Sequence, residues 1–199
     1  LSRLGRIGFA LQTPQYFGSA LAGRVQDGAA AIIVATGSLT RPEDEQTLPH
    51  ATVIGVTPDF WQAAGAQPPP GVFPARAAVN AALAQDLGLQ VGDTVLLNVQ
   101  RPSALGGDTL FSRRTRDGAL AGTVVEVAAK VPPGLGDFRL DAQTAVPRNV
   151  FVDHDWLAEH LGQPERANAV VVGANDSRST EAEITALNEA LRQHLSLDD

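Results

Sequence analysis

The chain has 199 residues, of which 44% are apolar, so it can bury a sizeable core as one domain or two small ones. Its 22 acidic and 15 basic residues give a formal net charge of −7. Such a charge argues against duplex nucleic acid as a partner, because neutralising phosphates needs a basic face. The absence of cysteine excludes disulfides, thiol catalysis and cysteine-ligated metals.

The chain contains no methionine, not even an initiator, and we therefore expect it to be a segment cut from a longer protein. Its longest apolar run, residues 29–35, is far shorter than the roughly 20 residues that a membrane-spanning helix needs. If the chain belongs to a membrane protein, its spans lie outside these boundaries.

The first third of the chain predicts a β-α-β unit. Apolar residues alternate over residues 7–11, which is the pattern of a strand. Thr13 and Pro14 then predict an N-cap and a first helical residue, and a helix with an apolar stripe ends at Gly28. The continuous apolar run over residues 30–35 predicts a strand that is buried on both faces.

A proline-rich break at residues 67–71 precedes a different pattern. Residues 78–87 predict a helix that ends at Gly88, and a turn at Gly92-Asp93 leads into a strand over residues 94–99. After an arginine-rich excursion, residues 122–128 predict a further strand.

The last third predicts two strand-helix pairs. Residues 149–152 form the first strand, after which Asp153 caps a short helix that ends at Leu161-Gly162. Residues 169–172 form the second strand, and residues 180–195 form a helix with a capping box and one apolar face.

These elements predict an α+β fold in which a β-α-β body is interrupted by a β-rich insert. We expect the body to comprise residues 1–69 together with 166–199. The inserted subdomain would then comprise residues 70–165, with loops longer than the usual few residues.

A search for catalytic motifs finds no nucleophile elbow, no paired zinc histidines and no phosphate-binding loop. The best chemical candidate is Asp153-His154-Asp155, in which a carboxylate beside an imidazole could bind a metal. We favour a helix N-cap with solvated neighbours instead, because adjacent side chains diverge and no third ligand is apparent. We therefore expect no catalytic, cofactor or metal site, and the chain is not expected to be an enzyme.

Two clusters are candidates for contact with a partner. Arg113, Arg114 and Arg116 could hold an anionic headgroup or an acidic protein surface, although a solvated strand edge is the simpler interpretation. Phe60 and Trp61 would be an aromatic anchor if they were exposed, but we favour the alternative that they pack as core beneath the insert.

The segment His50-Ala-Thr-Val-Ile-Gly-Val-Thr-Pro-Asp-Phe-Trp61 resembles part of the MacB-like periplasmic core domains found in ABC transporter permeases of the MacB/FtsX class. Three further segments follow in the order that the family has, and together they cover roughly residues 50–172. These segments are the helix-Gly-Val-Gly-Asp-strand of residues 78–97, Val146-Pro-Arg-Asn-Val-Phe-Val152, and Arg166-Ala-Asn-Ala-Val-Val-Val172.

The resemblance implies an extracytoplasmic domain between the first two transmembrane helices of a permease, with a porter-like α+β body interrupted by a β-rich subdomain. It also implies a cytoplasmic ABC ATPase that acts through those helices. The domain's work would then be mechanical, on a lipoprotein, an efflux partner or another protein or lipid-linked substrate outside the membrane.

Two other interpretations remain. The helix-Leu-Gly-x-x-x-Gly-Asp-x-Val pattern also occurs in double-psi β-barrels, which would make the chain a cofactor-binding module of an oxidoreductase. A free-standing soluble binding protein differs from the permease domain only in having no flanking membrane spans. The residues that precede and follow the chain would separate these cases.

Overall fold

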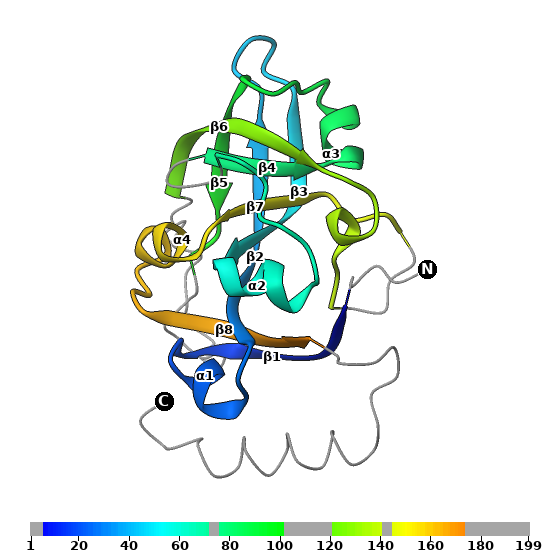
Figure 1. Cartoon of the computed structure of the whole chain (residues 1–199). Coiled ribbons are helices and arrows are strands. Elements are labelled where there is room, and N and C mark those ends of the chain that lie inside the picture. The colour runs from blue at the N-terminus through cyan, green and yellow to red at the C-terminus, as the bar shows by residue number, and fades with distance from the viewer. Residues whose placement is uncertain (1–5, 72–75, 102–120, 141–144, 174–199) are drawn as a thin grey trace, which may run out of the picture.

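The structure is a computed structural model that describes residues 6–71, 76–101, 121–140 and 145–173 (Figure 1). Strands dominate these residues, and the helices are short. The elements in chain order are β1 (Ile7–Gly18), α1 (Leu21–Val25), β2 (Ala29–Thr40), β3 (Thr47–Val56), α2 (Pro58–Ala63), β4 (Arg76–Asn80), α3 (Ala81–Asp86), β5 (Thr94–Val99), β6 (Ala121–Val131), the 3-10 turn η1 (Leu135–Asp137), β7 (Asn149–Asp153), α4 (His154–Leu161) and β8 (Arg166–Gly173).

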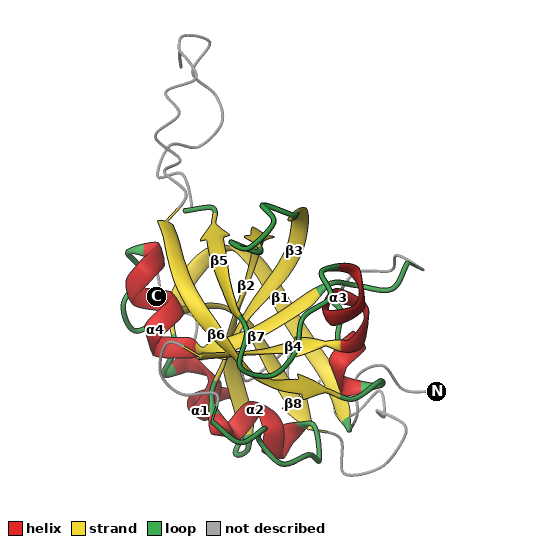
Figure 2. Cartoon of the chain, turned by 90° about the horizontal axis from the view of Figure 1, so that it is seen from above, coloured by secondary structure: helices red, strands yellow, loops and turns green. Residues whose placement is uncertain are grey.

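Six strands close into a barrel in the order β2-β3-β7-β4-β6-β5, because β5 pairs back onto β2. The pairs β3–β7 and β4–β6 are parallel, and the others are antiparallel. One buried cluster takes apolar side chains from all six strands, and α3 and α4, which flank the barrel in Figure 2, contribute to it. Burial alternates along β5, as expected for a strand with one face in the core.

A second, three-stranded sheet has the order β1-β8-β2. Because β8 is antiparallel to both neighbours, β1 and β2 run in the same direction with β8 between them. The apolar residues of α1 pack with one face of this sheet, and those of α2 pack with the other. The predicted β-α-β unit is therefore present, with β8 inserted between its two strands.

Strand β2 belongs to both sheets, and Figure 1 shows it running from the β1–β8 pair into the barrel. Residues 29–32 pair with β8, whereas residues 37–40 pair with β5. Between these stretches the Asn168 side chain takes the place of a neighbouring strand. Its Oδ1 accepts from the Val34 N–H at 2.8 Å, and its Nδ2 donates to the Val34 carbonyl at 2.9 Å.

The prediction of a helix that begins after Thr13-Pro14 is wrong for the first half of that helix, because β1 continues to Gly18. Thr13 does not cap a helix; its hydroxyl accepts from the Gln15 N–H at 2.9 Å, within a register shift between Gln12 and Phe17. After the shift, β1 pairs with β8 again at Phe17. Pairing with β8 thus overrides the helix start that Thr13 and Pro14 predict. Only α1, which has five residues, remains helical.

The helix predicted over residues 78–87 begins later, at Ala81. Residues 76–80 form β4 instead, which is paired on both sides by β6 and β7, so tertiary pairing overrides their helical periodicity. Asn80 caps the shortened helix, since its Oδ1 accepts from the Leu83 N–H at 3.1 Å. The predicted left-handed Gly88, with φ +63°, and the strand over residues 94–99 are confirmed.

The α+β class is confirmed, and the strands predicted near residues 122–128, 149–152 and 169–172 are present as β6, β7 and β8. Strands β2 and β3, from the predicted body, pair with β5 and β7, from the predicted insert. The division at residues 70 and 165 stays a prediction. The helix predicted over residues 180–195 lies outside the described residues. No helix among the described residues is long and apolar enough to cross a membrane.

Barrel closure requires a residue without a side chain at Gly37, where β2 lies between β3 and β5. A Cβ there would lie 2.6 Å from the Asn98 carbonyl oxygen and 2.8 Å from a Val53 methyl carbon. We expect Gly37→Ala to lower the free energy of unfolding by about 1–3 kcal/mol through overpacking, measured by urea denaturation.

Gly23→Ala is the matched control, because no atom lies within 4 Å of the added Cβ and the residue is inside α1. This control should raise stability by about 0.5–1 kcal/mol. Equal effects of the two substitutions would contradict the role given to Gly37.

Candidate functional site

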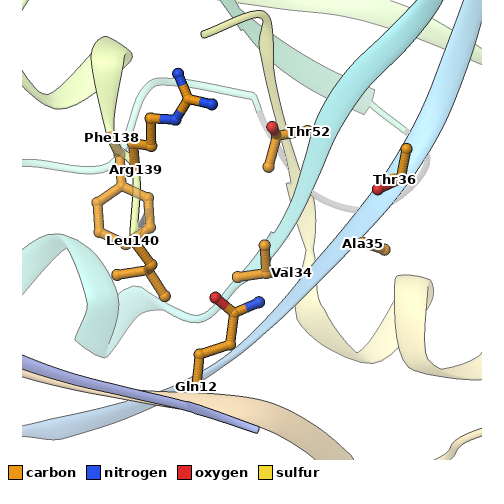
Figure 3. Close-up of a pocket in the computed structure, with 8 residues that line it drawn as sticks. All are labelled: Gln12, Val34, Ala35, Thr36, Thr52, Phe138, Arg139 and Leu140. Atoms are coloured by element: carbon orange, nitrogen blue, oxygen red, sulfur yellow. The ribbon is translucent and has the colours of Figure 1, made fainter. Parts of the chain in front are cut away.

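The candidate site is a cavity of about 220 Å³ at the junction of the two sheets. Figure 3 shows residues 138–140 on one wall and residues of β2 and β3 on the opposite wall, with Gln12 of β1 reaching in from one end. The lining consists of Gln12, Val34, Ala35, Thr36, Thr52, Phe138, Arg139 and Leu140.

Four of the lining side chains are polar. Thr36 and Thr52 are directly opposite one another in the β2–β3 register, which brings their side chains to the same face. Arg139 supplies a guanidinium group, and its Nη1 donates to the Ala145 carbonyl at 2.8 Å. None of the eight lining residues is an acid, a histidine or a lysine. The described lining therefore offers hydroxyl and amide groups, which both donate and accept hydrogen bonds, and the Arg139 guanidinium.

Two fully buried asparagines hold the wall that carries Phe138 and Arg139. The Asn149 Nδ2 donates to the carbonyls of Gly136 at 2.9 Å and of Phe138 at 2.7 Å. Asn80 Nδ2 donates to the Pro147 carbonyl at 2.8 Å, while its Oδ1 also accepts from the Asn149 N–H at 3.2 Å. These bonds tie the segment around η1 to the ends of β4 and β7.

Sequence reasoning missed both the cavity and the asparagines that shape its surroundings. Asn149 begins the buried strand β7 and Asn168 lies between apolar residues of β8, and a buried polar residue must find hydrogen-bond partners. That signal was available in the sequence. The cavity was not, because its walls come from segments that are far apart in the chain.

Phe60 and Trp61 lie in the core, with exposed fractions of 0% and 1%. Their rings meet edge to face with centroids 5.2 Å apart, and both contact Phe151. This burial agrees with the favoured interpretation that they pack as core and not with an exposed aromatic anchor, because α2 turns them toward the sheet. Their contact with a partner stays a prediction. Arg113, Arg114 and Arg116 lie outside the described residues, and their role stays a prediction.

The Asp153-His154-Asp155 segment is a helix start. Asp153 Oδ1 accepts from the Trp156 N–H at 2.9 Å, which confirms the predicted N-cap. His154 is buried, and its Nδ1 lies 2.8 Å from Asp155 Oδ1. The part of the chain that the structure describes contains no group of three histidine or acidic side chains placed to hold a metal.

The clearest shifts in acidity lie outside the lining of the cavity. The Arg41 guanidinium, which hydrogen-bonds to Asp44, lowers the pKa of that exposed carboxyl to about 2. Burial raises the pKa of the Tyr16 hydroxyl. Neither residue is among the described residues that line the cavity.

The N-cap can be separated from a metal site by two substitutions. Asp153→Ala should lower the free energy of unfolding by about 1 kcal/mol, whereas Asp153→Asn should stay within a few tenths, because an asparagine side chain caps equally well. Thermal unfolding with and without Zn²⁺ or a chelator should give unchanged midpoints. A midpoint that rises with Zn²⁺ in the parent chain, and not in Asp153→Asn, would restore the metal hypothesis.

No family model and no curated protein matches the chain. Solved structures do match it, and two transporter domains are among them. The periplasmic region of MacB from Actinobacillus actinomycetemcomitans superimposes with a TM-score of 0.55 and 13% identity, over 94% of this chain and 78% of that one. The extracellular domain of the noncanonic ABC-type transporter YknZ from Gram-positive bacteria gives a TM-score of 0.56 and 13% identity, over 93% of this chain and 90% of that one. The chain thus has the fold of MacB-type extracytoplasmic domains, as the sequence resemblance predicted.

Proposed function

We propose that the chain is the non-catalytic extracytoplasmic domain of an ABC transporter permease. In this role it couples ATP-driven motion across the membrane to a partner protein or a lipid-linked substrate outside it, in lipoprotein release, efflux or cell-envelope signalling. The observation that carries the proposal is the match to two transporter domains over nearly the whole chain.

The partners in this proposal are the permease's own transmembrane helices, which lie outside the segment, and a cytoplasmic ABC ATPase acting through them. The domain would lie on the periplasmic face of the cytoplasmic membrane. We retain the porter-like body of residues 1–69 with 166–199, and the insert of residues 70–165, as part of the same proposal.

Strand β2, which belongs to both sheets, supports a mechanical role. Because β2 is hydrogen-bonded to β8 in one half and to β5 in the other, a displacement of the three-stranded sheet is transmitted to the barrel through a continuous backbone. Strands paired in this way move as one body, which suits a domain that passes motion from the membrane outward.

The closed barrel also suits the alternative of a cofactor-binding module in an oxidoreductase. Size argues against a dinucleotide at the cavity described above, although a second cavity, which Gly18, Asp155 and Glu165 help to line, has a volume of about 960 Å³. Sites for drug-sized ligands usually have volumes of about 300–1,000 Å³, and this cavity of about 220 Å³ is too small for a dinucleotide.

The full-length gene product provides the direct test. We expect an apolar span of about 20 residues before residue 1 and another after residue 199, as in a permease. Sequencing the complete coding region checks this. Absence of both spans would leave a free-standing binding protein, and the permease proposal would fail.

We further propose that Arg113, Arg114 and Arg116 contact an acidic partner or an anionic headgroup. In the intact permease–ATPase complex, replacing all three by glutamine should reduce export or partner-dependent ATP hydrolysis at least several-fold, while basal ATP hydrolysis stays unchanged. Arg166→Gln, an exposed arginine of β8, serves as the control. Full retention of partner-dependent activity in the triple variant would remove the cluster from the proposal.

A further inference from the structure

Strand β2 has one edge without a neighbouring described strand where it passes from the three-stranded sheet into the barrel. Its pairing with β8 ends at Ile32, and its pairing with β5 begins at Gly37. Along the other edge, β3 pairs with the residues in between. The N–H and the carbonyl of Val34 point to the open edge, and both bond to the side chain of Asn168, at 2.8 and 2.9 Å. A single side chain of β8 thus connects the three-stranded sheet to the barrel part of β2.

The Asn168 amide can leave Val34 without displacing β8. The residues on either side, Ala167 and Ala169, keep β8 in its sheet, because both pair with β1. A backbone ladder opens several residues at a time, whereas one side chain is released by rotation about its own bonds. Loss of one hydrogen bond of this kind changes an equilibrium by about two- to tenfold. The pair can therefore break and form again while both sheets stay intact.

Apolar packing also joins the two sheets, but it is not directional. The aromatic side chains of α2 contact Phe151 of the barrel, and they share a buried cluster with Ile32 of β2 and Val171 of β8. Such packing keeps the sheets together and changes little when one sheet tilts slightly against the other. A hydrogen bond fixes the relative position more closely, because it weakens steeply with angle and distance. The Asn168–Val34 pair is therefore the contact that sets the angle between the sheets.

We propose that the Asn168–Val34 pair is a releasable joint between the three-stranded sheet and the barrel. While the pair is made, the two move as one body. When it breaks, the sheet changes its angle to the barrel by bending β2 at residues 33–36, where its strand pairing is with β3. The inference extends the proposed function, because motion from the membrane would supply the force that breaks the pair. The joint itself rests on hydrogen bonds and strand pairing within this chain.

Amide hydrogen exchange in the unmodified chain tests whether the joint releases. The Val34 N–H bonds to the Asn168 side chain, whereas the Ala35 N–H points to the opposite edge, toward β3. We expect Val34 to exchange about tenfold faster than Ala35, at a rate that low urea concentrations leave unchanged, because only a local opening is needed. Equal exchange rates would overturn the inference, and so would a Val34 rate that rises with urea as steeply as global unfolding does.

Distances between two spin labels test whether the joint controls the angle between the sheets. The chain has no cysteine, so Gly23→Cys on α1 and Gln85→Cys on α3 give unique attachment points on the three-stranded sheet and the barrel (Figure 1). We expect a narrow distance distribution while the pair is intact, and one about twice as wide in Asn168→Ala. Val95→Ala, the control, removes fully buried atoms within the barrel core and should leave the width unchanged.

A second variant keeps the test decisive if Asn168→Ala does not fold. In Asn168→Asp, an ionised carboxylate accepts from the Val34 N–H but repels the Val34 carbonyl, whereas the protonated acid donates to that carbonyl and restores both bonds. We expect a wide distance distribution at about pH 7.5 and a narrow one at about pH 4.5, because burial raises the pKa of a carboxyl group. The chain with Asn168 intact should give the same width at both pH values.

Three results of the label measurements contradict the joint. The first is that neither Asn168 variant widens the distance distribution. The second is that Val95→Ala widens it as much as Asn168→Ala does, which would indicate a general loosening of the fold. The third is that the distribution of Asn168→Asp stays equally wide on acidification. None of these measurements involves membrane spans or an ATPase, so failure here is distinguishable from failure of the permease proposal.

Discussion

The pairing of the Asn168 side chain with Val34 is the interaction on which the rest of the architecture depends. At Val34, β2 has left β8 and has not yet met β5. On that edge, the partly buried N–H and carbonyl of Val34 would otherwise have no strand to bond them. The asparagine amide presents an acceptor and a donor in the spacing of a peptide group, and these satisfy the N–H and the carbonyl of Val34. One strand can therefore serve two sheets without an unsatisfied backbone, which allows a barrel and a three-stranded sheet to share a continuous framework.

The cavity is a consequence of the same divergence. Where the two sheets part, none of the described strands fills the space between β1 and β3, and residues 138–140 line it instead. The described residues between β6 and β7 contain one turn of regular structure, η1, and the buried amides of Asn80 and Asn149 hold them in position. At Asn80, Asn149 and Asn168, side-chain amides thus bond backbone groups that strand pairing satisfies elsewhere. The cavity lies among these three residues.

Much of the fold followed from local patterns in the sequence. The alternation in β5, the left-handed Gly88 and the cap at Asp153 were predictable because neighbouring residues determine them. Residues 13–18 and 78–80 were not, since distant strands recruit them into sheets against their local signals. Barrel closure and the cavity depend on contacts between residues far apart in the chain. Burial of Phe60 and Trp61 agrees with the core interpretation favoured from the sequence, although the cluster that they join became known only with the position of α2. Arg113, Arg114 and Arg116 remain outside what the structure describes.

Because β5 closes the barrel onto β2, the free edge of the described strands lies at β1, at the far end of the three-stranded sheet. Among the described strands, only β1 has a neighbour on one side alone, and its twelve residues contain no charged side chain to discourage pairing with another molecule. Pro14 and the register shift interrupt its second half, so the straight uncharged stretch ends near Gln12. A shortened chain that lacked β1 would expose the valine-rich edge of β8 in its place, and such a chain would be prone to aggregate. Strand β1 therefore shields the edge of β8 from other molecules, in addition to its part in the fold.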